Sequence, residues 1–252
     1  MEYGTDYKVC PKCCGFYSQS ALRHHFKVCS NEVNKGSRNI FVMGRQITGR
    51  IHKSACKMLR KIIFPVLRED KVVRLIRYDY LIIAFGNKMC EKYSVYQHQH
   101  DMIRARLRLL GRFLQQVKEL DKNITDMASV FHPKFYEVTK HAIKIIANFN
   151  EDTRTYATPS IMTSLFSLLK QLGNRLVTLT IQMEQKDKQI EVEYFLKLLL
   201  EDYGASMNKA AVDTTMDIRR TNKERLSLPS KQDISKLTIL IFQIGKDWQK
   251  LS

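Results

Sequence analysis

The chain has 252 residues and 44% hydrophobic content, which is ordinary for a globular protein and sufficient for one sizeable domain plus a small module, or for two domains. Ten glycines and five prolines argue against a many-stranded sandwich or a disordered tail, and no run of eighteen apolar residues predicts a membrane helix. Six cysteines without a secretory segment favour a reduced, intracellular protein over a disulfide framework.

Charge is strongly positive and unevenly distributed. The chain has 42 Lys and Arg against 25 Asp and Glu, a net charge of +17. Residues 1–112 contain 22 basic and 8 acidic residues, whereas residues 113–252 contain 20 and 17. We therefore expect the first half to meet a polyanion, with double-stranded DNA as the partner. The alternative is a basic surface that serves only solubility.

The stretch with the clearest chemistry lies near the start of the chain. It has the spacing Cys-x2-Cys-x11-His-x3-Cys. Two thiolates from a tight turn, with an imidazole and a thiolate one helical turn apart, are typical of a closed, structural Zn²⁺ site. The pattern predicts a ββα zinc finger over residues 1–32, with the ligands Cys10, Cys13, His25 and Cys29.

The residues between these ligands support a finger but leave alternatives open. Tyr17 and Leu22 stand at the positions of the two small-core hydrophobes of a ββα finger. Cys14 and His24 are adjacent spare ligands that could substitute. The alternative without a metal is a set of reduced cysteines with a chance histidine.

A flexible basic linker is predicted after the finger, over residues 33–49. Small, polar and basic residues without a period would let the finger dock independently. A basic helical segment is expected over residues 50–100. It would open with an amphipathic helix from Arg50 to just before Pro65, which carries Lys53, Lys57 and Arg60 on its basic face. The apolar run at residues 81–85 fits a strand or a buried helix, and the neighbouring helices favour helix.

The most regular helical pattern spans residues 102–120, with Asp101 as the expected cap. Its apolar stripe, at residues 103, 107, 110, 114 and 117, predicts a core face. Three arginines step by four along another face, and Asp101 alone can pair with one of them, so we expect this row to contact phosphates. The alternative is an exposed face whose arginine stems cover apolar surface. The candidate contacts are Arg104, Arg108 and Arg112 here, and Gln19, Ser20, Arg23 and His24 for base reading by the finger helix.

Further helical patterns follow to the end of the chain. They cover residues 135–149, begin at Thr158-Pro159, recur around residues 190–203 and 205–221, and resume after Ser230, which is expected to cap the last helix. The last helix should bury one side. The sequence therefore predicts a mainly α protein, with a small ββα finger followed by a multi-helix bundle. The buried side of the last helix is expected to consist of Ile234, Leu237, Ile241, Ile244 and Trp248.

The sequence contains none of four common short motifs of nucleotide-binding and hydrolytic sites. No GxxxxGK[ST], GxGxxG, HExxH or GxSxG occurs. A zinc ion with four protein ligands has no open position for a substrate. The expectation is therefore a protein that is not an enzyme.

Several stretches resemble one family, in the same order along nearly the whole chain. They are the finger string from Cys10 to Cys29, residues 63–70 (IFPVLRED), residues 102–112 (MIRARLRLLGR), residues 155–160 (TYATPS), and residues 228–230 (LPS) leading to Trp248. These stretches resemble animal proteins derived from Crypton-like transposons, which encode tyrosine recombinases with an N-terminal C2HC finger.

The resemblance implies a SAM-like, core-binding DNA-binding domain over residues 101–225. It also implies that residues 226–252 are the first helix of a catalytic domain that does not follow. That domain carries an Arg, a His-x-x-Arg and a nucleophilic Tyr in the family, and no His-x-x-Arg occurs in this sequence. We expect a nuclear, zinc-dependent, non-catalytic DNA-binding protein, with homo-oligomerisation left open. The alternatives are a protein-interaction or transcriptional regulator module and the N-terminal fragment of an active recombinase.

Overall fold

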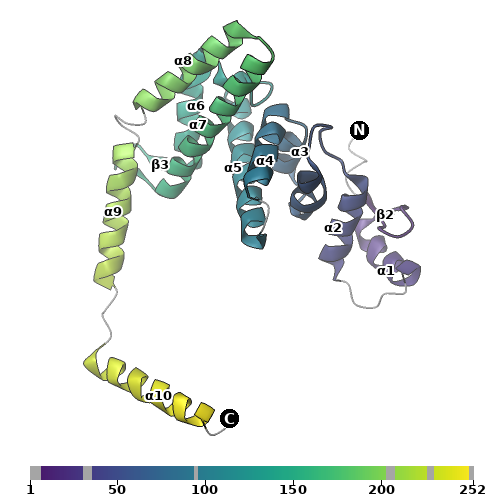
Figure 1. Cartoon of the computed structure of the whole chain (residues 1–252). Helices are drawn as coiled ribbons and strands as arrows, with labels where there is room; N and C mark the ends of the chain where they lie inside the picture. Colours follow the sequence, from purple (N-terminus) through teal and green to yellow (C-terminus); the bar gives the residue numbers. More distant parts are fainter. Residues whose placement is uncertain (1–6, 31–35, 94–95, 203–207, 226–229, 250–252) are drawn as a thin grey trace.

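The computed structural model describes residues 7–30, 36–93, 96–202, 208–225 and 230–249. Within these ranges the chain forms ten α-helices, short 3-10 and π-helical turns, and two small antiparallel sheets. The mainly α prediction is confirmed. Figure 1 shows the small module with α1 and α2 at one end of the molecule, the helical bundle in the middle, and α10 standing apart.

The first module has the predicted ββα architecture. Strands β1 (Tyr7–Val9) and β2 (Phe16–Ser18) pair antiparallel, with Val9 opposite Phe16, and α1 (Gln19–Ser30) follows directly. Leu22 and Phe26 lie one helical turn apart on the inner face of α1 and are buried with Cys10. This small core holds the helix against the hairpin.

The predicted flexible linker is wrong over most of its length, because residues 37–48 form a helix. Helix α2 (Ser37–Thr48) buries Ile40 in the finger core, beside Phe26. Gly44, one turn later, allows the closest approach: a Cβ there would lie 2.3 Å from the carbonyl oxygen of Val9. The polar and glycine content of this stretch hid an apolar face made by Ile40, Phe41 and Gly44.

The opposite side of α2 contacts the helical bundle through hydrogen bonds. The side chain of Gln46 donates to the carbonyl of Lys61 at 2.9 Å, and Lys61 Nζ donates back to the Gln46 carbonyl at 2.6 Å. Lys61 lies in a π-helical turn, η1 (Leu59–Ile63), which continues into the 3-10 turn η2 (Phe64–Val66). The finger is therefore packed on the bundle through α2.

The amphipathic helix expected from Arg50 to Pro65 is only partly present. Helical structure begins at Lys57, and residues 50–56 form turns and irregular chain. Ile51 and Ala55 are buried as their spacing predicted. In this non-helical stretch, the guanidinium of Arg60 donates hydrogen bonds to the carbonyls of Gly49, at 2.8 Å, and His52, at 3.2 Å.

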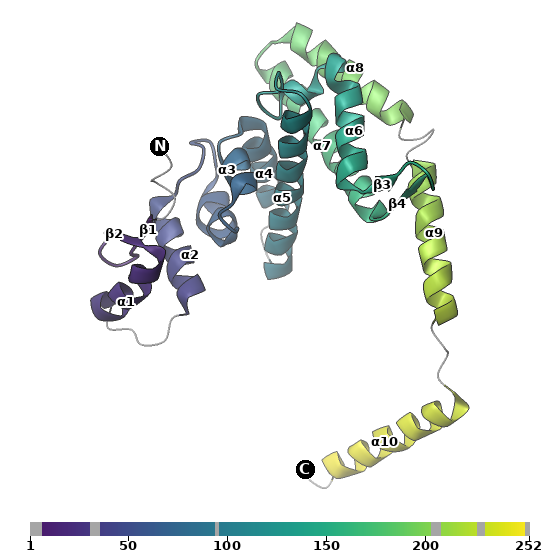
Figure 2. The ribbon, with the colours of Figure 1, turned by 180° about the vertical axis from the view of Figure 1, so that it is seen from behind.

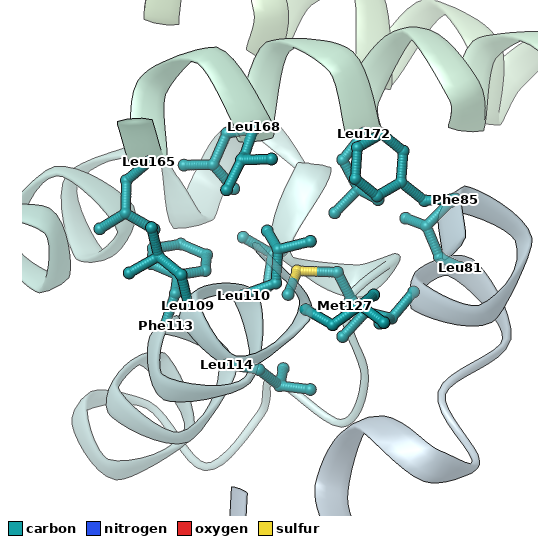
Figure 3. Close-up of a cluster of buried hydrophobic side chains, with 14 of the residues drawn as sticks. Leu81, Phe85, Leu109, Leu110, Phe113, Leu114, Met127, Leu165, Leu168 and Leu172 are labelled. Carbon is teal, nitrogen blue, oxygen red and sulfur yellow. The ribbon is translucent and has the colours of Figure 1, made fainter. Parts of the chain in front are cut away.

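The bundle has one continuous hydrophobic core that runs from Ile51 to Ala211. The expected boundary near residue 100 therefore separates no cores, and it falls inside a helix. Figure 3 shows leucine and phenylalanine side chains from α4, α5 and α7 meeting at the centre. The bundle elements are α3 (Lys71–Arg77), α4 (Tyr80–Lys92), α5 (Gln97–Leu120), η3 (Ser129–Phe131), η4 (Pro133–Phe135), α6 (Tyr136–Ile146), β3 (Phe149–Asn150), β4 (Thr155–Tyr156), α7 (Pro159–Gln182), α8 (Lys186–Asp202) and α9 (Asn208–Arg225).

Helix starts in the bundle follow local capping chemistry. The Asp70 carboxylate accepts from the backbone N–H of Val73, and Asp79 accepts from Ile82, so each aspartate caps the helix that follows it. The apolar run at residues 81–85 is helical, as favoured. Helix α5 begins at Gln97 and not after Asp101, which lies in its second turn.

Helices α7 and α8 pack closely at Gly173. A Cβ at this glycine would lie 2.6 Å from Leu196 Cδ2 and 2.9 Å from Phe131 Cε1. A larger residue would therefore force the side chains of Leu196 and Phe131 to shift. The mid-helix glycine therefore marks close helix packing.

Helix α10 (Lys231–Gln249) differs from the others because its described apolar side chains are exposed. Ser230 caps it, since its Oγ accepts from the backbone N–H of Asp233. Ile234, Leu237 and Ile241 are 55%, 59% and 60% exposed, so the predicted burial of this face is wrong for them. The side chains of Ile244 and Trp248 lie outside the described residues. Figures 1 and 2 show α10 apart from the bundle in both views. None of the helices in the described ranges is long and apolar enough to cross a lipid bilayer.

Candidate metal centre

The four predicted ligands converge in the finger. One donor atom from each of Cys10, Cys13, His25 and Cys29 lies within 4.8 Å of all the others. Cys13 Sγ is 3.2 Å from His25 Nε2. His25 and Cys29 come from successive turns of α1, so both point to the same side of the helix. The arrangement can hold a metal ion.

A tight turn brings the first two cysteines together. The backbone N–H of Cys14 donates to the Cys10 carbonyl at 3.0 Å, and the N–H of Cys10 donates to the Gly15 carbonyl at 2.9 Å. Cys14 takes a left-handed conformation, with φ of 60°, to close this turn. Cys14 and His24, the spare ligands of the sequence pattern, are exposed and lie outside the cluster.

Tyr17 orients the histidine ligand. Its ring stacks on the imidazole of His25, with centroids 3.8 Å apart and planes tilted by 17°. Its hydroxyl lies 3.7 Å from Cys13 Sγ. The sequence indicated only a small-core hydrophobe at this position. Its position four residues after Cys13 in the β2 strand is the feature that could have suggested the stacking.

The electrostatics of the cluster favour a thiolate at Cys13. A hydrogen bond from the Gly15 backbone, opposed by desolvation and helped by Tyr17 and His25, lowers the pKa of Cys13 to about 6. The hydrogen bond to Cys13 raises the pKa of Tyr17, so the phenol keeps its proton and donates it to the sulfur. Desolvation, followed by the neighbouring thiols, raises the pKa of Cys29. A thiolate is the form that binds metals.

The candidate base-reading residues lie on the outer face of α1. Gln19, Ser20, Arg23 and His24 are all exposed. Lys27, one turn after Arg23, shares this exposed face. Sequence reasoning missed Lys27, although its spacing of four from Arg23 could have revealed it.

The three candidate phosphate contacts near the start of the bundle differ in their exposure to solvent. Lys53 and Lys57 are exposed. Arg60 is partly buried and its guanidinium holds backbone carbonyls of the preceding loop. Arg60 therefore serves the local structure, whereas the two lysines remain accessible to a partner.

The exposed, unpaired arginine row expected on α5 is wrong for two of its three members. Arg104 is 8% exposed, and it donates to Asp101 at 2.6 Å and to the carbonyl of Ile62 at 3.0 Å. Arg108 donates to Asp70 at 2.6 Å. Asp70 is distant in sequence from α5, so periodicity along α5 could not reveal it as a partner. Arg112 is exposed.

Comparison with known protein-family models, curated proteins and solved structures gives no match for this chain. The resemblance to transposon-encoded tyrosine recombinases therefore stays a prediction, carried by the sequence stretches alone.

Proposed function

We propose that this protein is a zinc-dependent, non-catalytic, nuclear DNA-binding protein of transposon origin. The four converging ligands support the metal. Three thiols and an imidazole form a soft donor set that suits tetrahedral Zn²⁺, and four protein ligands leave no position for a substrate. The role of the ion is then to fold the finger.

The observation that carries the DNA proposal is the outer face of α1. The helix has no acidic residue among its twelve positions, and Gln19, Arg23 and Lys27 are exposed along one side. The major groove of DNA admits an α-helix, where Arg pairs with guanine and Gln with adenine. Lys53 and Lys57, which are exposed in the bundle, supply further positive charge for phosphates.

The metal is tested by elemental analysis of the full chain purified with zinc. We expect one zinc ion per chain, released by Cys13→Ser, whereas Cys14→Ser should retain it. A chain that binds no zinc, or that loses it equally in both variants, contradicts the assignment of ligands.

The DNA proposal is tested by fluorescence anisotropy with the zinc-loaded full chain and a labelled duplex. Binding should weaken with salt, with a slope of about −0.9 per phosphate contact. Arg23→Glu should cost about 1–3 kcal/mol of binding free energy. Arg219→Glu, at an exposed position on α9, is the control and should change little. Absence of binding to any duplex at low salt overturns the proposal.

A second function, as a protein-interaction module, is favoured by α10. Its apolar side chains at positions 234, 237 and 241 are spaced for one helical face and are exposed. A partner helix or a second copy of the chain could cover this face. Light scattering across protein concentration, with the wild type and with Leu237→Glu, tests self-association. A monomer at all concentrations for both proteins excludes the second copy.

A further inference from the structure

A cleft of about 220 Å³ opens where the finger meets the bundle. The finger hairpin forms one wall, α2 forms the base, and the segment from η2 to α3 forms the other wall. None of the sequence motifs drew attention to it, because its walls come from four separate stretches. Among the described residues, its lining has one carboxylate, Glu69, and six cationic side chains: they are Lys8, Arg45, Arg50, Arg60, Arg74 and Arg77.

Even without Lys8 and Arg45, Glu69 is the one described carboxylate in the lining for four arginines, Arg50, Arg60, Arg74 and Arg77. Glu69 is shared, since it pairs with Arg77 and lies 3.9 Å from Arg74 Nε. Arg60 bonds to backbone carbonyls, which carry no net charge, so its cation persists. The Nε of Arg77 is buried without a hydrogen-bond partner among the described residues. Arginine donors in this arrangement match the oxygens of a phosphate.

Two aromatic side chains stand at the finger wall of the cleft. Tyr7 is 57% exposed and Phe16 is 61% exposed, although both belong to a strand. The strand register pairs Val9 with Phe16, so Tyr7, two residues before Val9, lies on the same face of the hairpin as Phe16. Exposed aromatic rings beside arginines form a platform on which nucleic-acid bases stack, whatever their sequence.

The size and shape of the cleft decide which nucleic acid it can take. Its volume is below the roughly 300–1,000 Å³ of pockets that enclose drug-sized molecules. A concave site of this size cannot take a duplex, whereas the convex outer face of α1 can enter a groove. The cleft fits one unpaired base together with its phosphodiester group.

We propose that this cleft binds an unpaired nucleotide of a single-stranded nucleic acid. Arg74, whose side chain is half exposed and only loosely paired with Glu69, holds the phosphodiester group, and the base stacks on Phe16 or Tyr7. The proposal rests on the proposed nucleic-acid binding and adds a second site beside the duplex-reading helix. The same chemistry is offered by DNA and RNA strands, so both are used as probes.

The test measures anisotropy of a labelled twelve-nucleotide oligothymidylate, an oligouridylate of equal length, and a duplex, each with the zinc-loaded full chain. Phe16→Leu keeps apolar area but removes the ring, and it should lower affinity for the single strands about tenfold. Phe16→Trp restores a ring and should retain wild-type affinity. Arg74→Glu should also lower single-strand affinity about tenfold, and Arg219→Glu is its matched control.

The outcomes separate the cleft from the duplex-reading helix. Affinity for the duplex should stay within twofold in Phe16→Leu and in Arg74→Glu. If the wild type binds duplex but its single-strand affinity is absent or insensitive to both substitutions, the cleft proposal is overturned and the duplex proposal stands. If single strands bind through the cleft and no duplex binds, the cleft stands and the duplex proposal fails. Circular dichroism and zinc content confirm that each variant is folded.

Discussion

Asp70 and Arg108 join α3 to α5 through an ion pair of 2.6 Å between Oδ2 and Nη2, and the other oxygen of the same carboxylate caps α3 through the N–H of Val73. Both side chains are about 30% exposed, so the pair is partly shielded from solvent. One aspartate thus fixes the start of a helix and its attachment to the longest helix of the first half of the bundle. The same contact neutralises the charge of Arg108.

Substitution of Asp70 should therefore destabilise the bundle more than a typical surface change. Asp70→Ala removes the helix cap and leaves Arg108 without its carboxylate, which should lower the free energy of unfolding by about 1–3 kcal/mol. Denaturant unfolding followed by circular dichroism measures the change. Asp187→Ala, in the first turn of α8 and exposed, is the control and should change stability by less than about 0.5 kcal/mol. Equal stability of the two variants would contradict the role assigned to Asp70.

The contribution of Asp70 should also depend on pH. Desolvation opposes ionisation of this carboxyl, but the hydrogen bonds from Arg108 and Val73 outweigh it and lower its pKa. A lowered folded-state pKa means that the stabilisation is complete above the unfolded pKa of about 3.9 and is lost as pH falls through the folded value. The difference in unfolding free energy between wild type and Asp70→Asn should be constant near neutral pH and shrink below about pH 4. A difference that grows on acidification would show that the pKa shift has the opposite sign.

Removal of the metal should loosen α2 together with the finger. The finger core contains Ile40 of α2 beside Leu22 and Phe26, so loss of the ββα fold takes away the surface on which α2 packs. Hydrogen exchange after chelation should accelerate over residues 7–30 and 37–48. The amides of α5 around Phe113 should stay protected, because the bundle core does not include the finger.

Two results would contradict this extent of coupling. Unchanged protection of α2 after chelation would show that α2 belongs to the bundle alone. Loss of protection throughout α5 would show that the finger and the bundle unfold as one unit. Cys10→Ser provides the same perturbation without a chelator.

Gly44→Ala should separate α2 from the finger without touching a metal ligand. The added Cβ would lie 2.3 Å from the Val9 carbonyl oxygen, a backbone atom that cannot move aside cheaply. Overpacking of this kind costs about 1–3 kcal/mol. Gly36→Ala is the matched control, because a Cβ at Gly36 meets nothing within 4 Å. Thermal unfolding of both variants checks the prediction, and equal midpoints would show that α2 can shift without cost.

The elements that sequence reasoning identified correctly are those whose information is local. The metal ligands lie within twenty residues, so their spacing alone predicted the cluster. Ser230, expected as a cap from the sequence, caps the helix that begins immediately after it. The core stripe of α5 repeats with the helical period and is buried at all five positions.

The features that sequence reasoning missed depend on contacts between distant stretches. Arg108 has an obvious period along α5, but its partner Asp70 lies 38 residues earlier. Helix α2 was hidden by the glycines and polar residues of its stretch, and tertiary packing of Ile40 and Gly44 stabilises it. The cleft combines Phe16, Gly49 and Arg74, which no short pattern could bring together.

The packing of α2 against β1 also limits how this finger can be reused. Zinc fingers are commonly joined in series as self-contained cassettes, each with its own small core. Here the core of the finger is completed by Ile40, which lies beyond the last ligand. A transplant of residues 7–30 alone would leave the surfaces of Leu22 and Phe26 that meet Ile40 in contact with water. The smallest portable unit of this protein therefore extends through Thr48, and it carries with it the base of the basic cleft.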